Sequence, residues 1–232
     1  MIPVSDALRS RTFPFVNIAL ILANIAVFAY ELSLSQLDTA NLFFERGIIS
    51  IELTNWLESP SGLEEPATVF TSMFLHGGWL HLIGNMLFLW VFGDNVEDTL
   101  GHLGYLLFYA VGGIGAVALQ VYLEQDSVIP MIGASGAISG VLGGYLLLYP
   151  RATVRVVIPL LWFFGALPVR AVILIGFWFV LQLFYGVASL GPETEIGGGV
   201  AFWAHVGGFL TGLLIIAALS RLLTRRSRYR RP

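Results

Sequence analysis

Hydrophobic positions gather into six long apolar segments separated by polar stretches. Each segment is long enough to cross about 30 Å of hydrocarbon when tilt and local thinning are allowed for. The segments lie at about 14–33, 79–93, 100–122, 134–149, 169–189 and 200–222. We therefore expect an all-α fold, a polytopic membrane protein built as a bundle of six transmembrane helices.

Composition supports this expectation, because only 12% of the 232 residues are charged and 56% are hydrophobic. A soluble domain carries about 25% charged residues, and this length suits one bundle. We expect an N-terminal segment at 1–13, a membrane domain at 14–222 and a basic tail at 223–232. The first apolar segment lacks a small-residue cleavage site, so we read it as an anchor. Without cysteine, disulfides and thiolate chemistry are excluded.

The arginines predict the orientation in the membrane. Six spans put both termini on one side, and that side also receives most of the arginines, namely Arg9, Arg11, Arg151, Arg155 and those of the tail, with Arg170 if 151–169 is interfacial. Only Arg46 falls on the other side. The positive-inside rule then places both termini in the cytoplasm, and we expect a multi-pass protein of the plasma membrane. The basic tail is too short to indicate nucleic-acid binding and suits anionic membrane lipid.

The connection 34–78 is too long for a turn and too apolar for a linker. Hydrophobic residues alternate there with charged ones such as Glu45, Arg46 and Glu52. This pattern predicts short amphipathic helices lying in the outer membrane interface. The Ser-Pro-Ser-Gly sequence at 59–62 predicts a turn.

Two segments carry small residues at helical spacing. One row is Gly136, Gly140 and Gly144, and the other is Ala204, Gly208 and Gly212. Such rows let helix backbones approach closely inside a membrane. Glycine is common in membrane helices, and packing alone accounts for the rows. The packing nevertheless has a consequence, because it brings Ser135 and His205 within reach of each other.

Ser135 is a candidate nucleophile. Gly133 and Gly136 flank it and leave room for a substrate backbone, and Pro130 suggests that the helix begins close to the serine. A helix N-terminus offers free amide donors and a positive dipole end to an oxyanion. The competing interpretation is a packing serine bonded to a carbonyl one turn earlier.

His205 is the candidate base, because a neutral imidazole can take a serine proton and return it to a leaving amine. A lone histidine in an apolar helix is more often a structural group. The Gly-flanked serine on a close-packing helix favours the catalytic interpretation. No Asp or Glu lies in either segment, so a hydrolase would work through a Ser–His dyad.

His81 and Asn85 stand four residues apart and share one helical face. They could form a hydrogen-bonded clasp between helices, or donate to a tetrahedral oxyanion beside the Ser135 amide. Metal binding by His76, His81 and His205 fails, because no carboxylate lies at this depth and no H-E-x-x-H pattern is present. We expect neither a metal nor another cofactor.

Together these residues resemble the rhomboid family of intramembrane serine proteases. The matching elements are His81-x-x-x-Asn85, Gly133-Ala-Ser135-Gly136 and Ala204-His205-Val-Gly207-Gly208-x-x-x-Gly212. Their order, spacing and host segments agree with the family over about residues 10–222. His76 and a Gly93-x-x-x-Glu97 turn after the second span also fit.

The resemblance implies that Ser135 is the nucleophile, His205 the general base, and Asn85, His81 and the Ser135 amide the oxyanion hole. It implies a six-helix bundle of rhomboid type, with a water-filled cavity open to the outer side. The fifth segment, with Phe177, Trp178 and Phe179, would be a lateral gate for a substrate helix.

Two positions depart from the family pattern. Many members carry Trp-Arg in the first loop, where this chain has Ala67-Thr68. Some members stack a Tyr against the catalytic His, and that position is Ser139 here.

The expected function is therefore an intramembrane serine endopeptidase that cleaves single-span membrane proteins. One alternative is a non-catalytic relative that binds transmembrane helices for sorting or degradation. Such relatives usually lack the Ser or the His, and both are present here. A small transporter would predict inverted repeats, and the sequence has no internal repeat.

Overall fold

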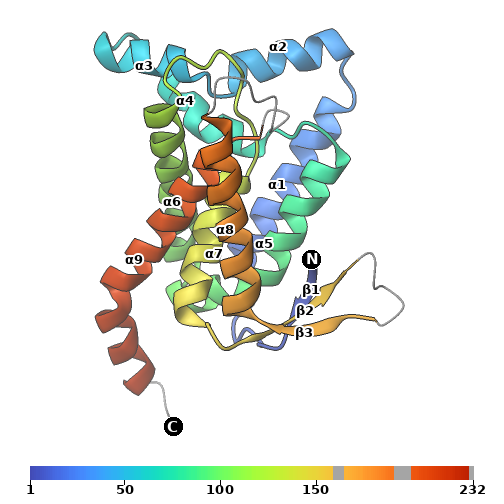
Figure 1. Ribbon diagram of the computed structural model, residues 1–232, viewed down its shortest axis with the longest axis vertical. Coiled ribbons are helices and arrows are strands. Elements are labelled where there is room, and N and C mark those ends of the chain that lie inside the picture. Colours follow the sequence, from blue (N-terminus) through green and yellow to red (C-terminus); the bar gives the residue numbers. More distant parts are fainter. Residues whose placement is uncertain (159–164, 191–199, 230–232) are drawn as a thin grey trace.

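The computed structural model is a bundle of long helices with a small sheet at one end and short helices across the other (Figure 1). It describes residues 1–158, 165–190 and 200–229. The long helices coincide with the six apolar segments and are α1 Phe15–Glu31, α5 Trp79–Leu100, α6 His102–Leu123, α7 Ser135–Leu148, α8 Ala171–Ser189 and α9 Phe202–Tyr229.

Within the described residues, three helices are long and apolar enough to cross a membrane by themselves, namely α6, α8 and the part of α9 up to Ser220. A fourth span results if Glu64–Phe74 and α5, bent by 83° at their junction, count as one. The apolar helices α1 and α7 are shorter, with 17 and 14 residues. The protein is thus mostly helical and multi-pass, and the six-span assignment stays a prediction.

Helix α5 extends beyond its predicted end, so the expected turn at Gly93–Glu97 is wrong. The helix continues to Leu100, and the chain reverses at Gly101, which has φ +78°. Polar residues are tolerated in this last part because they have partners. The fully buried Glu97 carboxylate accepts the backbone N–H groups of Val16 and Asn17 at 3.0 and 2.7 Å. An acceptor there satisfies free donors at the start of α1.

The first loop is helical, as its pattern predicts. It contains α2 Gln36–Arg46, α3 Ser50–Glu58, α4 Glu64–Thr71 and the 3₁₀ turn η1 Ser72–Phe74. Helices α2 and α3 lie across the end of the bundle opposite the sheet (Figure 1). The Thr71 hydroxyl donates to the Arg46 carbonyl at 2.7 Å, which ties α4 to the end of α2.

A three-stranded antiparallel sheet departs from the all-α expectation. Its order is β1 Ile2–Asp6, β2 Thr153–Val157 and β3 Leu167–Arg170. Thr-Val-Arg-Val-Val at 153–157 alternates β-branched residues around an arginine, which suits a strand. The predicted interfacial segment therefore forms a hairpin, although its residues 159–164 lie outside the described ones. Of the predicted basic tail, the part up to Tyr229 continues α9, and 230–232 also lie outside.

The sheet is fastened to the helices through Asp6. Its carboxylate accepts the Tyr145 hydroxyl of α7 at 2.6 Å and the Asn95 amide of α5 at 3.0 Å. Burial is the main cause that raises the pKa of Asp6 to about 6. The N-terminal strand β1 therefore binds α5 and α7 at the ends that lie next to the sheet.

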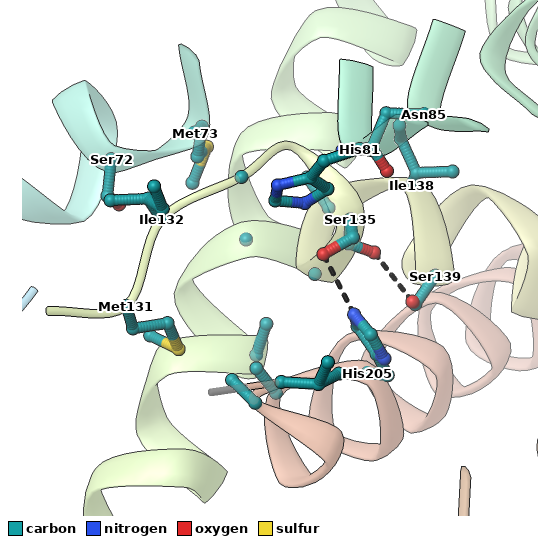
Figure 2. Close-up of a pocket in the computed structure, with 18 of the residues that line it drawn as sticks. Ser72, Met73, His81, Asn85, Met131, Ile132, Ser135, Ile138, Ser139 and His205 are labelled. Carbon is teal, nitrogen blue, oxygen red and sulfur yellow. Dashed lines mark hydrogen bonds between the residues drawn. The ribbon is translucent and has the colours of Figure 1, made fainter. Parts of the chain in front are cut away.

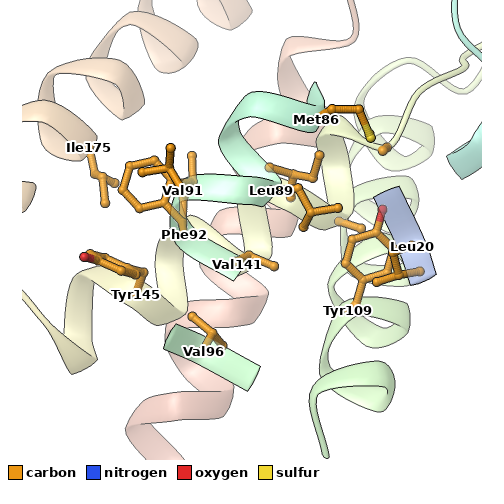
Figure 3. Close-up of a cluster of buried hydrophobic side chains, with 14 of the residues drawn as sticks. Leu20, Met86, Leu89, Val91, Phe92, Val96, Tyr109, Val141, Tyr145 and Ile175 are labelled. Carbon is orange, nitrogen blue, oxygen red and sulfur yellow. The ribbon is translucent and has the colours of Figure 1, made fainter. Parts of the chain in front are cut away.

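The core lies where α5, α6, α7 and α8 meet. Its buried side chains interdigitate between these helices (Figure 3) and include Leu89, Phe92, Val141, Tyr145 and Ile175. Because lipid tails are as apolar as these side chains, such a core stabilises the bundle through close packing.

The closest packing in the bundle joins α7 to α9, as the glycine rows predict. A Cβ on Gly208 would lie 2.0 Å from the Gly136 carbonyl oxygen, and one on Gly212 would lie 1.9 Å from that of Gly140. Any side chain at these positions would force the backbones apart. The two rows therefore face each other directly.

We expect Gly212→Ala to destabilise the fold by about 1–3 kcal/mol, the usual cost of overpacking a close-packed contact. The matched control is Gly176→Ala on α8, where a Cβ would meet nothing within 4 Å. Thermal unfolding of the purified variants in detergent measures both. Equal melting temperatures for the two variants would contradict the backbone contact.

Candidate active site

Ser135 is the first residue of α7, and its side chain points at His205 of α9 (Figure 2). The distance from Ser135 Oγ to His205 Nε2 is 2.8 Å, a hydrogen bond. The residues come from helices 70 positions apart in sequence. The packing of the glycine rows thus brings together the pair that the sequence singles out.

Gly133 shapes the approach to Ser135. Its φ of +122° lies in a region that side chains rarely adopt. A Cβ there would also come within 2.7 Å of the His81 ring. The Gly133 N–H donates to the Ser72 carbonyl at 2.8 Å, which fixes the segment against the first loop. Glycine is therefore required for conformation and for space.

Gly136 and Gly208 allow the close helix contacts next to Ser135. A Cβ on Gly136 would lie 2.6 Å from the Ala116 Cβ of α6, so α6 also packs closely at this level. Ala204, one residue before the histidine, donates its N–H to the Gln120 side chain of α6 at 3.0 Å. Helix α6 therefore fixes both helices that carry the pair.

The His205 ring is held by α8, which the sequence reasoning missed. Its Nδ1 lies 2.7 Å from the Gln182 side-chain oxygen, and its ring lies against Trp178 with centroids 6.0 Å apart. The sequence expectation of a dyad rested on the lack of Asp or Glu in the segments of Ser135 and His205, and Gln182 lies in neither. Gln182 is the only residue of α8 with an amide side chain, and its neighbours are mostly apolar. This isolated polar residue could have been identified from the sequence.

His81 lies beside Gly133 and faces the cavity near Ser135 (Figure 2). The Gly77 N–H donates to His81 Nδ1 at 3.4 Å. Because Nδ1 accepts this bond, the ring hydrogen belongs on Nε2. His81 can then donate a hydrogen bond from Nε2.

Asn85 is held by a chain of buried groups. Its amide Nδ2 donates to His76 Nε2 at 3.0 Å. His76 Nδ1 donates to the Phe74 carbonyl at 3.2 Å, and the His76 backbone N–H donates to the Glu31 carboxylate of α1 at 3.1 Å. Sequence reasoning did not find Glu31, because it ends an apolar helix far away in the chain. One hydrogen of the Asn85 amide is left for another acceptor.

Ser139 stands where some members of the family stack a Tyr against the catalytic His, and it does not take over that contact. Its hydroxyl donates to the Ser135 carbonyl at 2.6 Å, one turn earlier on α7 (Figure 2). This is the bond that the packing interpretation assigned to Ser135. The ring contact with His205 comes instead from Trp178.

These side chains line one cavity of about 720 Å³. Its walls include Ser135, His205, His81, Asn85, Met73, Met131 and Trp178. A space of this volume accommodates several residues of an extended peptide. No group of three or more metal-ligating side chains occurs within 1–158, 165–190 and 200–229.

The arrangement contains the parts of a serine hydrolase. A hydroxyl is bonded to an imidazole that can take its proton, and the imidazole is held from its other nitrogen. The first N–H groups of α7, which begins at Ser135, have no partner within the helix and are available to an oxyanion. His81 and Asn85 line the same cavity from α5.

Comparison with known proteins shows the family to which the chain is similar. Residues 63–222 match the family model described as Rhomboid domain. The chain is 28% identical over 158 residues to Rhomboid-like protein 11, chloroplastic, of Arabidopsis thaliana, covering 65% of this chain and 51% of that protein.

Two relatives are bacterial and are called proteases. The chain is 32% identical over 143 residues to Rhomboid protease AarA of Providencia stuartii, covering 54% of this chain and 47% of that protein. It is 32% identical over 152 residues to Rhomboid protease GluP of Bacillus subtilis (strain 168), covering 65% of this chain and 25% of that protein. The matches thus span about half the length of Rhomboid-like protein 11 and of AarA, and a quarter of the length of GluP.

We expect a fluorophosphonate probe to label the wild type and to leave Ser135→Ala unlabelled, because only an activated hydroxyl attacks phosphorus. Mass spectrometry of the modified peptide should place the probe on Ser135. Ser139, one turn later, is the internal control, because its hydroxyl is bonded to a carbonyl and has no base. Labelling of Ser139, or of the Ser135→Ala variant, would contradict the assignment.

Proposed function

Because the chain belongs to the rhomboid family, we propose that it is an intramembrane serine endopeptidase of the prokaryotic six-span type. Its substrates would be single-span membrane proteins. The observation that carries the proposal is the 2.8 Å hydrogen bond between Ser135 Oγ and His205 Nε2 inside an apolar bundle. Polar pairs at membrane depth are costly and usually serve function.

In the proposed reaction, Ser135 Oγ attacks the carbonyl carbon of the scissile bond while His205 Nε2 takes the hydroxyl proton. The imidazolium then gives this proton to the leaving amine, and an acyl-enzyme remains on Ser135. His205 next takes a proton from a water molecule that attacks the ester, and it gives this proton to Ser135 Oγ as the ester bond breaks and the new carboxyl terminus leaves. No carboxylate is assigned to the dyad.

The carbonyl oxygen becomes negative in the tetrahedral intermediate and needs donors. We assign this role to the Ser135 backbone N–H, to His81 Nε2–H and to the free hydrogen of the Asn85 amide. The His81–Gly77 and Asn85–His76 hydrogen bonds support the assignment, because each fixes a donor in the cavity wall. Preorganised donors of this kind cost no reorganisation during reaction.

The proposed topology puts the sheet and the chain termini in the cytoplasm and the catalytic cavity near the outer face. In support, Arg151, Arg155 and Arg170 belong to the sheet end of the bundle, while Ser135 begins α7 at the opposite end from β2. A substrate helix would enter past α8 and unwind before attack, so helix-weakening Gly or Pro near the cut would favour cleavage.

The test is cleavage of a single-span reporter by the purified protein in liposomes, with the cut mapped by mass spectrometry. We expect cleavage by the wild type and none by Ser135→Ala or His205→Asn. Undiminished cleavage by Ser135→Ala would reject the proposal. A wild type that binds the reporter but neither cleaves it nor reacts with the probe would instead favour a non-catalytic helix-binding protein.

We expect Asn85→Ala to lower kcat by about 10²–10³-fold with a smaller change in KM, because removing one oxyanion donor costs about that much. The control is Asn95→Ala, which removes an amide from the same helix near the sheet. The same reporter assay measures both variants. A change in KM alone would contradict a role in the transition state.

A further inference from the structure

Helix α8 carries a polar side chain that the dyad does not account for. Gln182 lies in an apolar helix, and its side-chain oxygen is 2.7 Å from His205 Nδ1. We propose that Gln182 is a positioning residue that holds His205 in the tautomer with hydrogen on Nδ1. The inference rests on the proposed function for its catalytic consequence.

The two ring nitrogens of His205 meet different partners. Nδ1 meets an amide oxygen, which can only accept, so Nδ1 must carry the hydrogen. A neutral imidazole has one ring hydrogen, and Nε2 then presents a lone pair to the Ser135 hydroxyl. In the other tautomer, Nε2–H would donate to Ser135 Oγ and could not take its proton. The Gln182 oxygen thus selects the form of His205 that can act as a base.

An amide also suits the apolar surroundings better than an acid. A carboxylate at this position would have to be desolvated in the bundle, which costs several kcal/mol in comparable settings. A neutral acceptor fixes the tautomer without this cost. It also gives the imidazolium less stabilisation than a carboxylate would.

Gln182 belongs to a set of α8 contacts that all face α9. Trp178, one turn earlier, lies against the His205 ring with centroids 6.0 Å apart. Phe179 stacks on Phe209, one turn after the histidine, at 4.2 Å. A displacement of α8 would therefore remove the ring contact and the Nδ1 acceptor together. The inference links the competence of the base to the docking of α8 on α9.

The first test reads the tautomer directly and does not need activity. The chain has four histidines, so ¹⁵N-histidine NMR of the protein in detergent is tractable, with His205 assigned by its loss in His205→Asn. We expect a protonated Nδ1 and a bare Nε2 on His205. In Gln182→Leu this preference should disappear. A hydrogen on Nε2 in the wild type, or an unchanged spectrum in Gln182→Leu, would overturn the inference.

The second test is kinetic. We expect Gln182→Leu to lower kcat on the reporter by about tenfold, the value of one net hydrogen bond, with little change in KM. Gln182→Glu keeps an acceptor oxygen and should recover most of kcat, while the desolvation of its carboxyl group lowers the melting temperature. Val180→Ala on the exposed face of α8 should behave as the wild type. A Glu variant as slow as the Leu variant would indicate a packing role and overturn the inference.

The two proposals fail in different ways. If the wild type and Gln182→Leu cleave the reporter equally fast, the protease assignment stands and the positioning role fails. If the wild type does not cleave, the protease assignment fails. The NMR measurement in that case still decides whether Gln182 sets the His205 ring.

Discussion

The contact between the backbones of α7 and α9 is the constraint on which the site depends. Gly136 and Gly140 meet Gly208 and Gly212 with no room for a Cβ, and one turn away the same two helices carry the bonded Ser and His. A hydrogen bond of 2.8 Å tolerates little displacement, and a shift of about 1 Å can cost 10²-fold in rate. In lipid, close packing of this kind holds two helices at a defined distance.

Helix α8 is attached to the bundle in a different way. It meets α9 through side chains, with Phe179 stacked on Phe209 at 4.2 Å and Tyr185 on Phe202 at 5.4 Å, and a Cβ on its Gly176 would touch nothing within 4 Å. Side-chain contacts can separate and re-form more readily than interlocked backbones. If α8 moves aside for a substrate helix, as the proposed function requires, Gln182 moves away from His205 with it.

The apolar runs were sufficient to predict the long helices. The glycine rows were sufficient to predict that Ser135 and His205 come together, because their helical spacing is a local pattern in the sequence. The sheet was missed because its three strands are short and β1 lies far in sequence from the other two. The predicted end of α5 was wrong because a charged residue such as Glu97 is typical of a loop. Its hydrogen-bond partners at the start of α1 become known only from the structure. Gln182 was missed for a similar reason, since its role depends on the packing of one helix against another.

The proposed function gives the two histidines of the site opposite tasks, and the hydrogen bonds of each ring match its task. His81 Nδ1 accepts a backbone N–H from Gly77, so its hydrogen lies on Nε2 and faces the cavity as a donor. His205 Nδ1 meets the Gln182 oxygen, so its Nε2 carries the lone pair that Ser135 needs. An oxyanion donor and a general base require these opposite tautomers. Under this proposal a neutral group on the far nitrogen sets each tautomer, and a Ser–His dyad would then need no buried acid beside it.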